Sequence, residues 1–239
     1  MTPDELLASM FPDGHEVTND NGILTGTGPL RTGKRALVVG ISGRRAVGVD
    51  EAIRLSAFVL RSLREGGGPI LVVVDSDSQR MSKRDELLGL NEFLAHLAKC
   101  LIYADMHGRP TIGILFGHTA AGAFLATALA TRVLVGLPGA SPAVMDLPSM
   151  SKVTKLPIEV LEQKAKTTPV FAPGLENLTQ TGAVHLLWDD KKPLVDQLDL
   201  LLASLPVARD CRDNLGKERK GRRKAAEIAE RVHAIAIKQ

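Results

Sequence analysis

The stretch of this sequence whose residue types could most clearly take part in a reaction is ILFGHTAAGAFLAT, residues 114–127. An apolar run ends at Gly117, a single histidine follows at His118, and small residues then open a helical pattern. A helix N-terminus carries unpaired N–H groups, and small side chains let a substrate oxygen approach them. Such donors stabilise an enolate or a tetrahedral oxyanion. Close packing of a helix on a sheet explains the same small residues, and the sequence leaves both interpretations open.

Other patterns offer weaker chemistry. Residues 28–35, GPLRTGKR, match the first part of a phosphate-binding P-loop, but Arg35 stands where Mg²⁺ needs a serine or threonine. Asp75 and Asp77 lie at the end of a predicted strand and are either metal ligands or turn formers that bond their own backbone. The histidines lack metal-ligand spacing, and the sequence contains no G-x-S-x-G elbow. We therefore expect neither a metal site nor a serine-hydrolase triad.

These residues must be positioned by an α/β framework. Four short apolar runs predict strands at residues 36–41, 69–75, 109–116 and 132–138. Helical patterns separate them at residues 48–68, with Asp50 as a candidate cap, and at 85–108 and 120–131. This alternation favours parallel strands joined by helical crossovers. Further along, we expect a loop-rich connection at 139–157, helices at 157–168 and 193–205, and a short strand at 183–190.

Composition sets the class of protein. The chain has 239 residues, 44% hydrophobic but only 3% aromatic, which argues against stacking platforms for single-stranded nucleic acid. Its net charge is a mild +3. The two cysteines, Cys100 and Cys211, give no disulfide framework. We expect a cytoplasmic protein, because the N-terminus does not resemble a signal peptide and no apolar run reaches the length of a membrane span.

Three segments differ in character and define the predicted domains. Residues 1–35 are polar and glycine-rich, and we expect an arm or hairpin there rather than core. Residues 36–207 carry the α/β pattern. Residues 208–239 form a basic, helical segment. It contains ten Lys and Arg and five Asp and Glu, which gives a net charge of +5.

The α/β pattern resembles a known superfamily. Residues 110–148 read as a strand, a small-residue turn, an Ala/Gly-rich helix and a strand beginning with Arg-Val, as in the carboxyltransferase branch of the crotonase superfamily. Residues 68–79 fit the preceding strand and turn, and residues 141–174 resemble malonate decarboxylase gamma subunits more narrowly. The resemblance covers about residues 30–205 and implies a crotonase-like spiral of ββα units.

The resemblance also implies a site. In this superfamily, two backbone N–H groups from different turns hold a thioester oxygen. By position, one donor is Ser78 or Gln79, and the other is Gly122, with Ala121 beside it. The remaining candidate substrate-contacting residues lie on neighbouring loops and are Gly117, Thr119 and Ser141. Many relatives have glycine-rich turns at both donor positions, whereas this chain has serine, aspartate and glutamine at the first.

His118 has two interpretations. It is a candidate for steering a carboxylate or for delivering a proton to an enolate carbon. The alternative is a turn residue bonded to a backbone carbonyl.

The implied reaction is decarboxylation of a malonyl thioester, carried on the prosthetic arm of an acyl carrier protein, to an acetyl thioester. Loss of CO₂ leaves negative charge on the thioester oxygen, so hydrogen-bond donors suffice without a metal. The implied partners are a related beta subunit that shares the active site, the acyl carrier protein subunit and the acyl carrier protein transferase subunit. We expect no cofactor bound by this chain, no biotin, no nucleic acid and no membrane.

Two other functions stay open. One is a carboxyltransferase or enoyl-CoA hydratase-like enzyme acting on another acyl thioester, although Leu125 stands where a hydratase would place a carboxylate. The other is a non-catalytic scaffold for the beta subunit. The basic tail is a solvated helix, a dock for the partner subunit, or an attractor for an acidic carrier protein or its phosphates. An apolar stripe at helical spacing in this tail comprises Ile228, Val232 and Ile235.

Overall fold

Contacts divide the chain into two units, the first of which is built on a seven-stranded sheet. The computed structural model describes residues 1–167, 173–206 and 209–237. Unit 1 comprises Met1–Val144 and Leu186–Arg209, and unit 2 comprises Met145–His185 and Asp210–Gln239. The domain boundaries predicted from composition do not coincide with these units.

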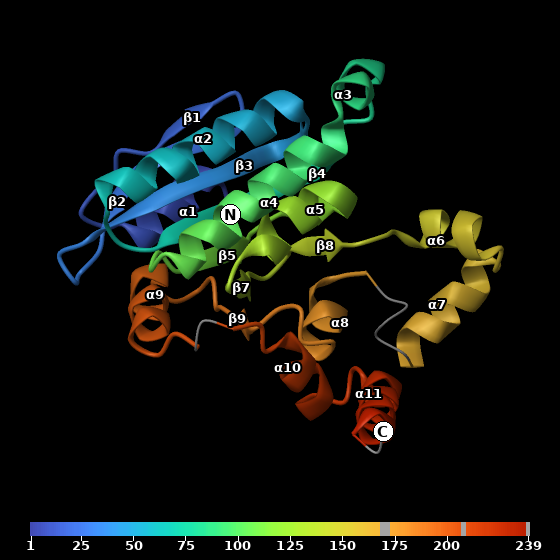
Figure 1. Ribbon diagram of the computed structural model, residues 1–239. Helices are drawn as coiled ribbons and strands as arrows, with labels where there is room; N and C mark the ends of the chain where they lie inside the picture. Colours follow the sequence, from blue (N-terminus) through green and yellow to red (C-terminus); the bar gives the residue numbers. More distant parts are fainter. Residues whose placement is uncertain (168–172, 207–208, 238–239) are drawn as a thin grey trace. The chain divides into compact units, whose positions relative to one another are not determined.

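The sheet of unit 1 has the strand order β1-β2-β3-β4-β5-β7-β9 (Figure 1). Its strands are β1 (Thr18–Asp20), β2 (Ile23–Pro29), β3 (Arg35–Val47), β4 (Ile70–Gln79), β5 (Thr111–Leu115), β7 (Val133–Gly136) and β9 (Leu186–Leu187). The first three pair antiparallel, and the pairs from β3 onward are parallel. A separate parallel pair joins β6 (His118–Ala120) to β8 (Ser141–Ala143). The four predicted parallel strands are confirmed.

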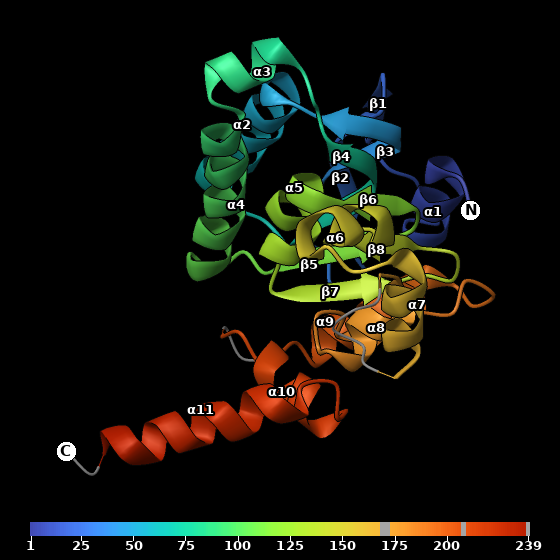
Figure 2. The ribbon, with the colours of Figure 1, turned by 90° about the vertical axis from the view of Figure 1, so that its right-hand side faces the viewer.

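Helices cover both faces of this sheet. In unit 1 they are α1 (Pro3–Met10), α2 (Val49–Glu65), α3 (Lys83–Leu88), α4 (Leu90–Met106), α5 (Ala121–Ala126), the 3₁₀ turn η1 (Ala128–Ala130) and α9 (Leu194–Ala203). Helices α2 and α4 lie side by side on one face (Figure 2). Helices α1 and α9 pack together on the opposite face of the sheet. They share a core cluster there with every second residue of the central strands, because alternate side chains of a strand point to opposite faces.

Three details of the helices differ from prediction. The predicted helix at 85–108 is two helices, because Gly89 adopts the left-handed conformation at φ 85° and ends α3. The predicted helix at 120–131 ends at Ala126, and η1 follows it. The N-cap of α2 is Gly48 rather than Asp50, and its N–H donates to Glu51 at 2.9 Å.

The N-terminal segment belongs to the core, which corrects the expectation of a peripheral arm. Leu6, Leu7 and Met10 of α1 are almost fully buried, as is Phe11. A Cβ on Gly28 would lie 2.5 Å from the Phe11 ring, so β2 needs glycine there. Residues 1–35 are polar on average, so their composition did not reveal the four apolar side chains of one short helix and its C-cap.

A repeated ββα arrangement positions the candidate site. Strand β5 continues into β6 and α5, and β7 continues into β8 and then α6 (Leu147–Thr154). Each of these two ββα arrangements contributes one strand to the large sheet and one strand to the small parallel pair. Loops at the carboxyl ends of parallel strands thereby meet at one edge, where α/β proteins bind ligands.

Unit 2 is mainly helical. It contains α6, α7 (Ile158–Thr167), α8 (Leu175–Gln180), α10 (Arg212–Glu218) and α11 (Arg223–Ala236). The connection expected to be loop-rich at 139–157 thus holds β8 and α6. Helix α7 confirms the prediction through Thr167, and residue 168 lies outside the described residues. The tail is helical as predicted, and its stripe is exposed, with Ile228 at 62%.

Within unit 2, Arg219 links α10 to the segment after α8. Its guanidinium donates hydrogen bonds of 2.7 Å to the carbonyl oxygens of Thr179, Val184 and His185. Burial lowers the pKa of His185 to about 4, so its ring is neutral near pH 7. In the described ranges of both units, no helix combines the length and apolar character needed to cross a membrane.

Candidate functional site

Asp75, on β4, ties the end of β3 to the start of β6 at the carboxyl edge of the sheet. Its Oδ2 accepts hydrogen bonds from the N–H groups of Gly43 at 2.9 Å and Arg44 at 3.3 Å. Its Oδ1 accepts from the N–H of His118 at 3.0 Å. A Cβ on Gly117 would lie 2.2 Å from Oδ1, so only glycine fits at this position. Asp75 is therefore not a turn former, because it lies inside β4 and accepts from the backbone of β3 and β6.

His118 lies on β6, directly opposite Ser141 of β8. Its Nδ1 is 3.1 Å from the Ser141 hydroxyl, so its partner is a side chain and not the backbone carbonyl of the alternative interpretation. The side chain of Thr119 is fully buried, with its hydroxyl 2.8 Å from that of Ser76. Thr119 therefore holds β6 against β4, while the partly exposed His118 faces accessible space.

Ala121 and Gly122 form the turn into α5. Ala121 has φ of 49°, in the left-handed region that favours glycine, so the turn is strained. The Gly122 N–H donates a 2.9 Å hydrogen bond to Oε1 of Gln79. The structure thus brings together two positions predicted to hold a substrate oxygen. Gln79, however, contributes a side-chain acceptor here, and it occupies the Gly122 N–H.

The first predicted donor turn is a strand. Ser78 and Gln79 end β4, and Gln79 lies opposite Val47 of β3. The Ser78 hydroxyl donates to the Gln79 carbonyl at 3.2 Å. Since β3 extends past its apolar run to Val47, it continues the pairing of β4 beyond the point where the apolar pattern ends. The expectation of an open turn at residues 76–79 is corrected accordingly.

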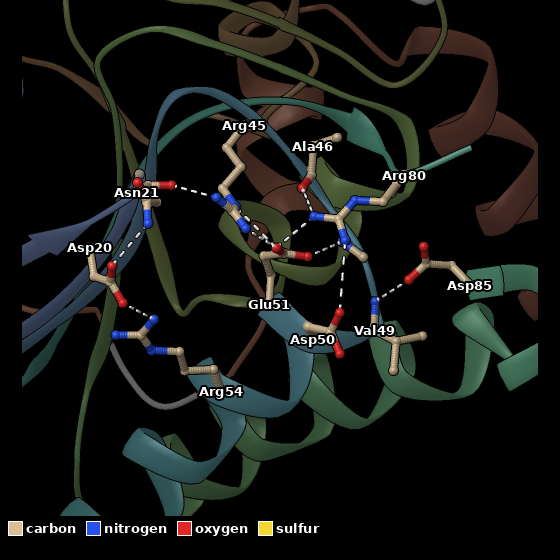
Figure 3. Close-up of polar contacts among 12 residues, drawn as sticks. Asp20, Asn21, Arg45, Ala46, Val49, Asp50, Glu51, Arg54, Arg80 and Asp85 are labelled. Carbon is tan, nitrogen blue, oxygen red and sulfur yellow. Dashed lines mark hydrogen bonds and ion pairs between the residues drawn. The ribbon is translucent and has the colours of Figure 1, made fainter. Parts of the chain in front are cut away.

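A buried carboxylate, missed in the sequence, fixes the end of β4 (Figure 3). Glu51 is fully buried at the start of α2. Its Oε1 accepts from Arg45 at 2.7 Å and from Arg80 at 2.6 Å, and its Oε2 accepts from the Gly48 N–H at 2.9 Å. We call Arg45, Glu51 and Arg80 the Glu51 cluster. Arg80 directly follows Gln79, so the cluster holds the strand that presents Gln79.

The Glu51 carboxylate is charged in spite of its burial. Burial raises the pKa of Glu51, but the hydrogen bonds from Arg45, Arg80 and the Gly48 N–H outweigh it and bring the pKa below its usual range. A signal for this residue exists in the sequence, namely glutamate three positions after an N-cap residue. Its arginine partners come from other elements and carry no local signal.

A second buried carboxylate, Asp85, and a more exposed ion pair flank the cluster (Figure 3). Asp85 accepts the Val49 N–H at 2.9 Å, and hydrogen bonds from Ser82 and Val49 lower the pKa of Asp85. Arg54 pairs with Asp20 at 2.6 Å at the other end of the group. These contacts fix the start of α2 relative to β1 and α3.

The site is suited to hydrogen bonding and proton transfer. Across the described residues, no group of three or more His, Cys, Asp or Glu side chains is arranged to hold a metal ion. The edge instead offers the Gln79 carboxamide, the His118 ring and a strained turn. These groups can stabilise charge on an oxygen and move a proton.

The fold recurs in solved structures of a transcarboxylase and of a malonate decarboxylase. The 12S transcarboxylase with hydrolysed methylmalonyl-coenzyme A bound is similar at a TM-score of 0.68 and 15% identity, over 87% of this chain and 41% of that chain. A Pseudomonas malonate decarboxylase hetero-tetramer in complex with coenzyme A is similar at a TM-score of 0.77 and 23% identity, over 97% and 98%. The predicted crotonase-like, carboxyltransferase-type α/β fold is confirmed.

The sequence places the chain more narrowly within this class. It belongs to the malonate decarboxylase gamma subunit (MdcE) family, whose model matches residues 42–236. The malonyl-S-ACP:biotin-protein carboxyltransferase MADD of Malonomonas rubra is 31% identical over 154 residues, which is 60% of this chain. The match covers 53% of MADD, so the chain spans about half the length of this curated relative.

Proposed function

We propose that this chain is the gamma subunit of a malonate decarboxylase, which acts with a beta subunit on malonyl-S-acyl carrier protein. Membership of the gamma subunit family supports the assignment. The observation that carries the site is the convergence of Gln79 and Gly122, 2.9 Å apart, on the edge where the resemblance expects the thioester oxygen. The chain then forms one wall of an active site shared with the beta subunit.

The proposed chemistry needs only donors and a proton. The carbon–carbon bond to the carboxylate breaks, CO₂ leaves, and the electron pair becomes an enolate with its charge on the thioester oxygen. Donors at the edge formed by Gln79 and the turn into α5 stabilise this charge as it develops. A proton then adds to the enolate carbon and gives the acetyl thioester. His118, whose Nδ1 is 3.1 Å from the Ser141 hydroxyl, is the proposed proton donor.

We propose further partners from the same family assignment. The acyl carrier protein presents the thioester on its prosthetic arm, and a transferase subunit loads it. The basic tail, with its net charge of +5, is the proposed attractor for the acidic carrier or its phosphates.

A second candidate function follows from the relative in Malonomonas rubra, which is named for carboxyl transfer to a biotin protein. In that case the carboxyl group would pass to biotin and not leave as CO₂. Avidin separates the two, since it blocks biotin. Decarboxylation that continues at the same rate in excess avidin supports the biotin-independent reaction.

The assignment is tested by reconstitution with the beta subunit and malonyl-loaded carrier. We expect acetyl-thioester formation by the complex and little by either subunit alone. Gly122→Val should abolish it while assembly stays intact in gel filtration, because an added side chain meets Gln79 Oε1 at 3.1 Å and Leu94 at 3.2 Å. A Gly122→Val complex at the wild-type rate would contradict the proposed site. Hydration of an enoyl thioester by the isolated chain would favour the hydratase alternative.

A further inference from the structure

We propose that the Gln79 carboxamide, anchored through its oxygen on the Gly122 N–H, is the donor that this chain offers to the substrate oxygen, through Nε2. The inference rests on the proposed function and names the group that performs it. The resemblance assigns this role to backbone N–H groups. In this chain one of them is already engaged at 2.9 Å, and a side chain stands in its place.

The hydrogen bond to Gly122 decides which way the carboxamide faces. A backbone N–H donates only, so it requires Oε1 and excludes Nε2 from that position. The amide nitrogen must therefore face away from the turn. Its one contact among the described residues is with the Met81 sulfur at 3.8 Å, and a thioether is a weak acceptor. Two N–H bonds of a half-buried amide are thus available to a stronger acceptor, such as an enolate oxygen.

The backbone at this edge offers a poorer donor than the carboxamide. Helix α5 has six residues, so its N-terminal dipole is short. The strained turn at Ala121, with φ of 49°, directs one N–H at Gln79 and not at open space. A carboxamide polarised at its oxygen by that N–H becomes a better donor at its nitrogen, because hydrogen bonds in a chain strengthen one another.

The side chain is held from both ends. Its oxygen is fixed on Gly122, and its backbone is fixed because the next residue, Arg80, bonds Glu51 at 2.6 Å and donates its N–H to the Val47 carbonyl at 2.9 Å. A donor held in place before the reaction needs little reorganisation when charge develops on the substrate. The Glu51 cluster therefore serves as a positioning group for Gln79.

The test uses the reconstituted complex and separates kcat from KM. Gln79→Glu keeps an oxygen for the Gly122 N–H but replaces the donor by a second oxygen. We expect kcat to fall by about 100-fold or more, with KM changed only a few-fold, because a donor to developing charge acts in the transition state. Gln79→Ala removes the donor but frees the Gly122 N–H, so its kcat should lie between those of wild type and Gln79→Glu. Gln163→Glu, an exposed change of the same kind on α7, is the matched control and should leave kcat unchanged.

The other outcomes overturn the inference in different ways. A Gln79→Ala complex as fast as wild type or faster would show that the carboxamide only covers the Gly122 N–H. A Gln79→Glu complex at the wild-type rate would show that the substrate oxygen lies elsewhere. In both cases the proposed function still holds if the wild-type complex is active and the Gly122→Val substitution abolishes that activity. An inactive wild-type complex contradicts the proposed function itself.

Discussion

Two polar regions at the same edge of the sheet differ in how completely their groups are paired. The Glu51 cluster is charged, and its carboxylate accepts from two arginines and an N–H. The edge formed by Gln79, His118 and Gly122 is half-exposed, and among the described residues the amide nitrogen of Gln79 has a hydrogen-bond contact only with a thioether sulfur. A fully paired group fixes geometry, whereas a partly paired one retains capacity for a ligand. The contrast predicts that changes in the cluster act mainly on stability, and on turnover only through the position of Gln79, whereas changes at the edge act on turnover.

The largest effect on stability is expected from Glu51→Gln. The amide leaves Arg45 and Arg80 without their buried counter-charge, so unfolding should become easier by about 3 kcal/mol, allowing for the partial exposure of both arginines. Urea denaturation of the two chains measures this difference. An unchanged midpoint would mean that the cluster does not hold the fold.

Acid provides the control for this prediction. The pKa of Glu51 is lower in the folded chain than in the unfolded one. Its contribution is therefore complete above the unfolded value of about 4.3 and is lost as pH falls through the folded value. The difference in unfolding free energy between wild type and Glu51→Gln should therefore become smaller as pH falls over that range. A difference that does not change with pH would mean that the substitution acts through packing and not through the charge.

A smaller effect is expected from Asp75→Asn, which lies between the two regions. The carboxylate accepts three N–H groups through two oxygens, and asparagine keeps only one of those oxygens. The unmatched N–H groups should cost about 2 kcal/mol of unfolding free energy. Denaturation measures it, and Asp77→Asn, at an exposed neighbouring carboxylate, is the control. An equal change in unfolding free energy for Asp75→Asn and Asp77→Asn would contradict the proposal that the three N–H bonds of Asp75 stabilise the fold.

The smallest effect is expected from Ser141→Ala at the open edge. Within the described part of the chain, the exposed hydroxyl has one hydrogen-bond contact, at 3.1 Å from His118 Nδ1. Its loss should change the unfolding free energy by less than about 1 kcal/mol. A loss as large as that of Glu51→Gln would contradict the distinction between the two regions.

The parts of the fold that local pattern determines were predictable. Apolar runs identified β3, β4, β5 and β7, because a buried parallel strand is apolar on both faces. The residues of the edge were also named, since small residues at Ala121 and Gly122 imply backbone access. Gln79 was expected to contribute its backbone, however, and the pairing that places it in β4 depends on the length of another strand, β3.

The remaining features depend on residues far apart in the chain. Glu51 meets Arg80 across 29 positions, and no local window contains both. The burial of α1 was missed because its apolar residues find their partners in α9 and distant strands. Tertiary packing decides such cases, and a single sequence does not display it.

The contact between α1 and α9 has a consequence for synthesis on the ribosome. The Leu194 N–H donates to the Ser9 hydroxyl at 3.0 Å, across 185 positions, and the same two helices share the core cluster. Helix α1, the first to emerge, therefore has no packing partner in α9 until most of the chain has been translated. Until then its leucines are open to chaperones, and long-range closure of this kind is slow. Pulse-chase protease protection should show that unit 1 becomes resistant only after α9 has left the exit tunnel.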